Sequence, residues 1–341
     1  MHRRALLAAL AAPALPGMLS ACREPPLAGQ DDPTLDAKVL NRQLQALAER
    51  ARPGVLGVAV QDLTTAQRAA VAGDQSFPME GAWKAILGAA VLAEAEAKAL
   101  SLDDVLAVAD VDLSPPPSGV ADAWPGRDRY TIEELLKRAV ALGDNTAADV
   151  LMKRIGGPGA LTAWLELRKV DEIRLDRYAR QFLPERTGTA SFRADWKGQA
   201  WRKAVLATPP GRRQAAQRLY LTDPRDTATP LGAVRFLEAL NQFELTSQDG
   251  RRRLLRLMEA AAGDRLRPAL PDGARLATLT SWTPYDLGLC AADSTLALVR
   301  LKDGRRFALA IFLKASPLED ENRTALVVEV ARTVLKMAAK A

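Results

Sequence analysis

One lysine stands where an amine could carry out acid–base chemistry, near the start of a helix predicted over residues 81–100. An amine three residues after a serine can accept the proton of the hydroxyl, because residues i and i+3 share a helix face. The segment here is Gly81-Ala82-Trp83-Lys84, so the amine is present and the hydroxyl is absent. No serine of the chain has a lysine three residues later, so the pair has not moved elsewhere.

Histidine chemistry is excluded by composition. The single histidine of the chain is His2, which lies in a segment that we expect to be removed. The remaining chain can form neither a Ser-His-Asp triad nor a Cys-His pair, and it offers no imidazole to a metal ion. We therefore expect no metal and no cofactor.

Residues 1–22 have the composition of a cleaved export signal. Arg3 and Arg4 precede an Ala/Leu-rich stretch, and Leu19-Ser20-Ala21-Cys22 resembles a lipobox. We expect acylation of Cys22 and export to the periplasmic side of a bacterial membrane, which is the outer membrane if the organism is Gram-negative. The arginine pair also fits a twin-arginine signal, so Sec and Tat export both stay open. Residues 23–34 are polar and proline-broken, as expected of a tether.

The periodicity of residues 35–341 predicts one α/β (α+β) domain. Residues 35–78 and 223–341 contain two terminal helices and the predicted strands, which favours an antiparallel sheet built from both chain ends. Residues 79–222 are mostly helical in pattern, so we expect an inserted all-helical subdomain. Within it, Phe182 to Pro210 is irregular and predicts a partly structured loop.

The charge pattern gives no sign of a polyanionic partner. A net charge of +6 over 341 residues is a mild imbalance. Its densest cluster, Arg251-Arg252-Arg253 with Arg256, alternates with leucines at helical spacing and predicts a solvated helix face. We expect no nucleic-acid partner.

Several short strings follow one another in a fixed order along the chain. They are Phe77-Pro78-Met79, Ile86-Leu87-Gly88, Asp144-Asn145-Thr146, Arg174-Leu175-Asp176-Arg177-Tyr178, Asp226-Thr227-Ala228-Thr229-Pro230 and Leu270-Pro271-Asp272-Gly273. In order and spacing the chain resembles the class A β-lactamases over residues 38–340 and, more distantly, the penicillin-binding serine transferases. The resemblance implies the β-lactamase fold, a serine-hydrolase fold, with a catalytic cleft.

The four catalytic elements that the resemblance implies are degenerate here. Glycine stands in place of the nucleophilic serine, and a second glycine replaces the relay serine of Ser-Asp-Asn. Alanine stands in place of the general-base glutamate, and Lys-Thr-Gly has become Leu-Thr-Ser. The degenerate positions are Gly81, Lys84, Gly143, Asn145, Ala179, Leu279, Thr280 and Ser281.

The residues left in this region allow more than one interpretation. Lys84 is either a buried amine satisfied by Asn145 and backbone carbonyls or a repurposed ligand contact. Trp83, Trp282 and Tyr285 either line the old cleft for a new ligand or fill space that function no longer needs. Ser281, at the former glycine position, is the weakest candidate, as a displaced nucleophile facing Lys84.

We expect an exported lipoprotein with no functional catalytic residue, a pseudoenzyme of the cell envelope that binds a ligand or acts as a scaffold. A cell-wall-derived ligand or an envelope protein is the expected partner, besides the membrane that holds the lipid. The alternative is an enzyme with residual or altered hydrolase activity. A purely structural partner of another envelope protein is a third possibility, which differs from the first in having a filled cleft.

Overall fold

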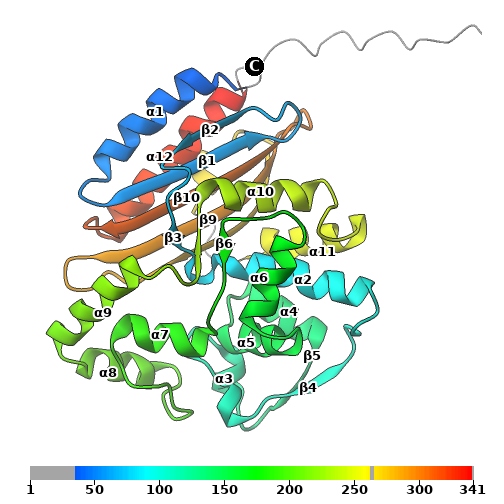
Figure 1. Cartoon of the computed structure of the whole chain (residues 1–341), viewed down its shortest axis with the longest axis vertical. Coiled ribbons are helices and arrows are strands. Elements are labelled where there is room, and N and C mark those ends of the chain that lie inside the picture. Colours follow the sequence, from blue (N-terminus) through cyan, green and yellow to red (C-terminus); the bar gives the residue numbers. More distant parts are fainter. Residues whose placement is uncertain (1–34, 262–264, 340–341) are drawn as a thin grey trace, which may run out of the picture. The chain divides into compact units, whose positions relative to one another are not determined.

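A five-stranded antiparallel sheet joins the two ends of the chain in the computed structural model (Figure 1). The structure describes residues 35–261 and 265–339, which belong to one compact unit. The predicted signal, Cys22 and the tether lie outside these residues. The strand order is β2-β1-β10-β9-β8, with β1 Val55–Asp62, β2 Arg68–Val71, β8 Arg275–Trp282, β9 Cys290–Arg300 and β10 Arg306–Ser316.

Helices cover both faces of this sheet, as its strands require. Strands β9 and β10 are buried along almost their whole length, so neither face of the sheet is left to solvent. Helices α1 (Ala37–Arg50) and α12 (Asp320–Ala339) pack on one face through apolar side chains that recur every three or four residues. Helices α10 (Pro230–Asn241) and α2 (Lys84–Glu96) contribute to the core on the other face. This is the predicted arrangement of sheet and terminal helices.

The inserted part of the chain is helical, as predicted. A capping box starts α4, because Thr131 accepts from the backbone N–H of Glu134 and Glu134 accepts from that of Thr131. The helices here are α3 Gly119–Ala123, α4 Ile132–Ala141, α5 Asn145–Arg154 and α6 Pro158–Glu166. The short strands that tie this part together are β3 Phe77–Pro78, β4 Val105–Ala107, β5 Arg129–Thr131, β6 Ile173–Arg174 and β7 Thr227–Ala228.

The segment expected to be a partly structured loop, residues 182–210, holds more helix than expected, although residues 188–198 lie outside any helix. Three helices follow one another here, α7 Ala179–Thr187, α8 Gln199–Ala207 and α9 Pro210–Thr222. None of the residues of α8 is buried. Aromatic contacts hold it instead, since the ring of Trp201 lies 5.7 Å from that of Phe192 and 6.2 Å from that of Trp196.

An ion pair closes the base of this three-helix segment, residues 178–225. The Nε of Arg177 lies 2.6 Å from a carboxylate oxygen of Asp226, whose other oxygen accepts from the backbone N–H groups of Asp176 and Arg177. Both side chains are buried, and the contact joins residues that are 49 positions apart. The three-helix segment therefore leaves and re-enters the domain at one fixed point.

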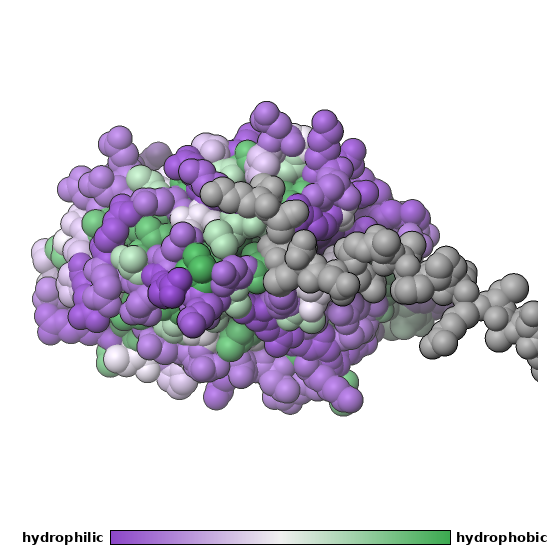
Figure 2. Space-filling view, turned by 90° about the horizontal axis from the view of Figure 1, so that it is seen from above, coloured by the Kyte–Doolittle hydropathy of each residue, from purple (hydrophilic) through white to green (hydrophobic). Residues whose placement is uncertain are grey.

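One face of the molecule is mainly polar (Figure 2). On the face shown in Figure 2, hydrophilic side chains cover most of the area and hydrophobic ones lie between them in small groups. Within residues 35–261 and 265–339, no helix combines the length and apolar character needed to cross a bilayer.

Candidate functional site

A cavity of about 670 Å³ lies where the three-helix segment meets the edge of β8 and the start of α2. Its lining includes every degenerate position named above except Ala179. Helices α7, α8 and α9 supply further walls, through Leu183, Trp201, Leu206 and Gln217 among others. The volume falls within the range of about 300–1,000 Å³ that is typical of small-molecule sites. The cleft is therefore open enough to hold a ligand.

Lys84 is buried at the floor of this cavity and is held by two acceptors. Its Nζ lies 2.5 Å from the carbonyl oxygen of Gly143 and 2.6 Å from the Oδ1 of Asn145. The side-chain amide of Asn145 in turn donates to the carbonyl of Pro115, which fixes its orientation. Burial lowers the pKa of Lys84 to about 8, although the nearby carboxylates of Asp144 and Asp149 act in the opposite direction.

Gly81 begins the turn that should carry the nucleophile, and a serine from the sheet faces it. A Cβ placed on Gly81 would lie 2.9 Å from the Oγ of Ser281 and 3.7 Å from the Nζ of Lys84. The hydroxyl of Ser281 therefore takes up the space beside the missing side chain. It makes no hydrogen bond to Lys84 or to any other residue within the described part of the chain.

Ala179 offers no group to the cavity and marks only the start of α7. Its backbone N–H donates to Asp149, as does that of Arg180, and the hydroxyl of Ser114 donates to the same carboxylate. Burial raises the pKa of Asp149 to about 6, against the effect of these hydrogen bonds. Asp149 is thus an N-terminal anchor for α7, and its role was not predicted from the sequence.

Glu80, the residue before Gly81, is the most consequential residue that the sequence analysis missed. Its carboxylate is only 5% exposed, and it lies 2.5 Å from the guanidinium of Arg186 on α7 and 2.5 Å from the hydroxyl of Tyr220 on α9. Burial and then the charge of Glu80 raise the pKa of Tyr220 well above its usual value, so the phenol stays protonated and donates. The turn at Gly81 is thereby joined to two helices of the three-helix segment.

A second ion pair closes the other side of the cavity. Arg213 of α9 lies 3.0 Å from a carboxylate oxygen of Asp286, in the connection between β8 and β9, and Gln217 donates to the backbone carbonyl of Asp286. In the sequence, this contact between α9 and Asp286 is indicated only by the spacing of Arg213, Gln217 and Tyr220. That spacing places three polar side chains on one helix face.

The three aromatic candidates separate in the structure. Trp282 and Tyr285 line the cavity, and Trp282 keeps 39% of its surface exposed. Trp83 points into the core, where it is 2% exposed, and does not line the cavity. Trp83 packs behind Lys84, whose Nζ lies 6.0 Å from the centre of the indole ring.

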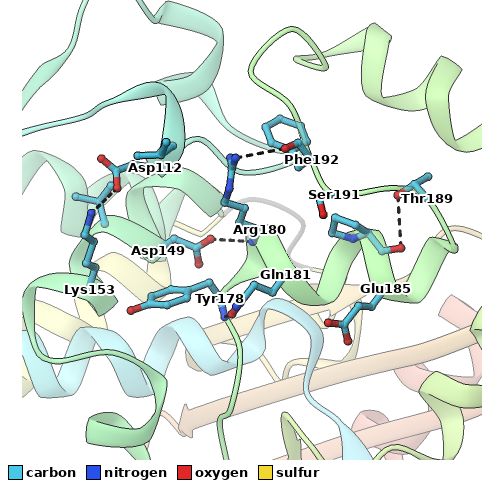
Figure 3. Close-up of a pocket in the computed structure, with 13 residues that line it drawn as sticks. Asp112, Asp149, Lys153, Tyr178, Arg180, Gln181, Glu185, Thr189, Ser191 and Phe192 are labelled. Carbon is cyan, nitrogen blue, oxygen red and sulfur yellow. Dashed lines mark hydrogen bonds and ion pairs between the residues drawn. The ribbon is translucent and has the colours of Figure 1, made fainter.

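A second cavity, of about 620 Å³, lies on the opposite face of α7. Gln181, Pro184 and Glu185 face it, whereas Phe182, Leu183 and Arg186 face the first cavity. Figure 3 shows Asp149 reaching toward the start of α7 and Lys153 toward Asp112, 2.7 Å away. Among the described residues, none of the degenerate positions lines this cavity, so we take the first as the candidate site. The described residues also contain no group of three side chains placed to hold a metal ion.

The buried amine makes stability depend on pH in a defined direction. Between about pH 8, the pKa of folded Lys84, and 10.5, its unfolded value, the unfolded chain binds more protons than the folded chain. Stability must therefore rise with pH in this window. The free energy of unfolding of the wild type relative to Lys84→Met is expected to increase by up to about 1.4 kcal/mol per pH unit. Urea unfolding of both proteins at pH 7 to 10 measures this difference in the free energy of unfolding. A difference between wild type and Lys84→Met that does not change with pH would contradict a lowered pKa of Lys84.

Comparisons with known proteins agree with this geometry. Residues 38–338 match the family described as the β-lactamase enzyme family. The chain is 29% identical to β-lactamase L2 of Stenotrophomonas maltophilia over 290 residues, which cover 84% of this chain and 82% of L2. It is 23% identical to β-lactamase VEB-1 of Pseudomonas aeruginosa, over 83% of this chain and 85% of VEB-1.

Solved structures give the same result. A β-lactamase from Chitinophaga pinensis superposes with a TM-score of 0.72 at 22% identity, over 88% of this chain and 99% of that one, which shows a shared fold. An ancestral class A β-lactamase of Gram-negative bacteria superposes with a TM-score of 0.69 at 30% identity, over 87% of this chain and 99% of that one. With a family match that extends over residues 38–338, the chain belongs to the class A β-lactamase family.

Proposed function

We propose that this protein is a catalytically inactive member of its family that binds a ligand in the reshaped cleft. The observation that carries the proposal is the open cavity of about 670 Å³ with glycine at position 81. Removal of a covalent nucleophile and its partners lowers rates by several powers of ten, whereas a cavity needs only shape and charge to bind. The family fold supports a cleft at this place, and the lost side chains argue against turnover.

The lining of the cavity defines the chemistry of the ligand. Glu80 is neutralised by Arg186, and Asp286 by Arg213, which leaves Lys84 and Arg202 as the lining cations that form no ion pair with an acidic residue in the described part of the chain. Apolar walls come from residues such as Phe182, Val205 and Trp282. A ligand with an apolar body and at least one carboxylate fits these walls, and soluble cell-wall fragments and penicillins both carry carboxylates.

Two exposed leucines allow a matched test of the cavity. Leu206 lines it and is 60% exposed, and Leu219 on α9 is 72% exposed and does not line it. Leu206→Asp should weaken binding of a soluble cell-wall peptide or of a penicillin at least about tenfold, because it places a negative charge beside an anionic ligand. Leu219→Asp should leave affinity within about twofold. Calorimetric titration measures both, and an equal effect of the two substitutions would rule out this cavity as the binding site.

A second candidate function, residual or altered hydrolase activity, is favoured by one observation. A Cβ built on Gly81, where the family nucleophile would stand, lies 2.9 Å from the Oγ of Ser281 and 3.7 Å from the Nζ of Lys84. In such a reaction Ser281 would attack an acyl carbonyl, neutral Lys84 would take its proton, and the leaving group would receive it. We place hydrolase activity second because Ser281 makes no hydrogen bond to Lys84 in the described structure.

Intact-mass spectrometry separates the two functions. After incubation with a reactive penicillin we expect no covalent adduct, and we expect no hydrolysis of a chromogenic cephalosporin beside it. An adduct that maps to Ser281 and disappears in Ser281→Ala would establish the hydrolase reading instead. Ser294→Ala provides the control, because this neighbouring serine on β9 donates to Met79 and does not line the cavity.

We also propose that the protein is anchored by lipid on the periplasmic side of the membrane, where it meets its ligand or an envelope partner. The support is the string Leu19-Ser20-Ala21-Cys22, which precedes the described residues. Cys22→Ala should move the protein from the membrane fraction to the soluble fraction after cell lysis. Retention of the Cys22→Ala protein on the membrane would contradict lipidation at this residue.

A further inference from the structure

Three neighbouring strands each end in an arginine at the same level of the sheet. Arg300 of β9 is paired in register with Arg306 of β10 on one side and with Arg275 of β8 on the other. Residues paired in register point to the same face of a sheet. Ala277 and Leu298, two positions along from Arg275 and Arg300, belong to the core on the helical side. The three arginines therefore share the face that carries α10 and α11 (Gln248–Glu259).

A fourth arginine joins them from α11. Arg251 was expected on a solvated helix face, but it is buried, with 9% of its surface exposed. Its guanidinium lies 3.1 Å from the Oδ1 of Asn241, and that of Arg306 lies 3.4 Å from the same oxygen. We call Arg251, Arg275, Arg300 and Arg306 the arginine cluster. Two of its cations thus share one neutral acceptor.

The arginine cluster lacks compensating negative charge. Burial and then the charges of Arg306, Arg252 and Arg300 lower the pKa of Arg251, so its charged neighbours are like charges. The Nε of Arg251 is buried and has no hydrogen-bond partner among the described residues.

Four acids near the cluster in the sequence are already paired with arginines outside it, and Asp272, three residues before Arg275, makes no ion pair among the described residues. Glu238 and Glu244 contact Arg235, Asp249 contacts Arg252, and Asp303 contacts Arg305. No member of the cluster takes part in an ion pair with a described acidic residue.

Like charges placed directly opposite each other in a sheet are destabilising. The sheet carries two such pairs side by side, Arg275 with Arg300 and Arg300 with Arg306. A multivalent anion would convert this repulsion into attraction. Guanidinium groups bind phosphate oxygens in a bidentate manner, and a phosphate group with two charges offsets more of the cluster than a single carboxylate does.

We propose that the arginine cluster is a binding site for a phosphate-bearing anion, separate from the cleft. Arg275 and Arg300 are exposed and would reach the ligand first, whereas Arg251 and Arg306 are held from behind by Asn241. The phosphate belongs either to a small molecule or to the headgroup of an anionic phospholipid.

The test compares wild-type protein with Arg275→Gln/Arg300→Gln in buffer of low ionic strength. Without added anion, loss of the like charges should raise the melting temperature of the variant by about 1–3 °C. Pyrophosphate should raise the melting temperature of the wild type above that of the variant, and should bind the variant at least about tenfold more weakly by calorimetric titration. Arg42→Gln/Arg218→Gln removes the same charge from two exposed sites and should behave as the wild type does.

A second arm identifies the source of the phosphate. Co-sedimentation with vesicles of phosphatidylglycerol and phosphatidylcholine, compared with vesicles of phosphatidylcholine alone, detects a headgroup. Binding to the anionic vesicles without binding to pyrophosphate assigns the cluster to a lipid surface, and the reverse assigns it to a soluble phosphate. The proposal is overturned if neither probe binds, or if the control variant loses binding to the same extent as the cluster variant.

Discussion

The reshaped cleft depends on one buried carboxylate, that of Glu80. A buried charge must be paired, and its partners, Arg186 and Tyr220, come from two helices of the three-helix segment. Loss of one partner of such a buried pair typically costs about 3–5 kcal/mol, because the other charge is left uncompensated. The conformation of α7 and α9 is therefore coupled to the turn at Gly81. The floor and the wall of the cavity form one structural unit.

The same site shows how a buried amine is accommodated next to a glycine. The hydroxyl of Ser281 lies beside the vacant Cβ position of Gly81, so little empty space remains there. Lys84 keeps two strong acceptors, Gly143 and Asn145, and thus needs no serine partner to remain buried. The hydrogen bonds of Lys84 and Asn145 are thus made within the protein.

The sequence predicted the framework well because the framework is built from apolar periodicity and capping. The local signals include the helical spacing of Leu40, Leu44 and Leu47, which are buried in α1, and the capping box at Thr131, which starts α4. The three-helix segment could not be predicted in this way. Its inner face is made of polar groups such as Arg213, Gln217 and Tyr220, whose burial depends on partners far along the chain.

Tertiary packing also explains why Trp83 and Arg251 lie in environments other than those expected from the sequence. Trp83 is next to Lys84 in sequence, but the turn directs its ring into the core, where it supports the lysine from behind. Arg251 lies in a basic run, yet Asn241 and the ring of Phe243 bury it, so its charge acts on β9 and β10. The residue type shows that Trp83 brings an apolar ring and Arg251 a positive charge. Tertiary packing decides which parts of the structure the ring and the charge contact. Positive charge thus lies at two separate places in one domain, at Lys84 and Arg202 beside the cavity and at the arginine cluster at the end of the sheet.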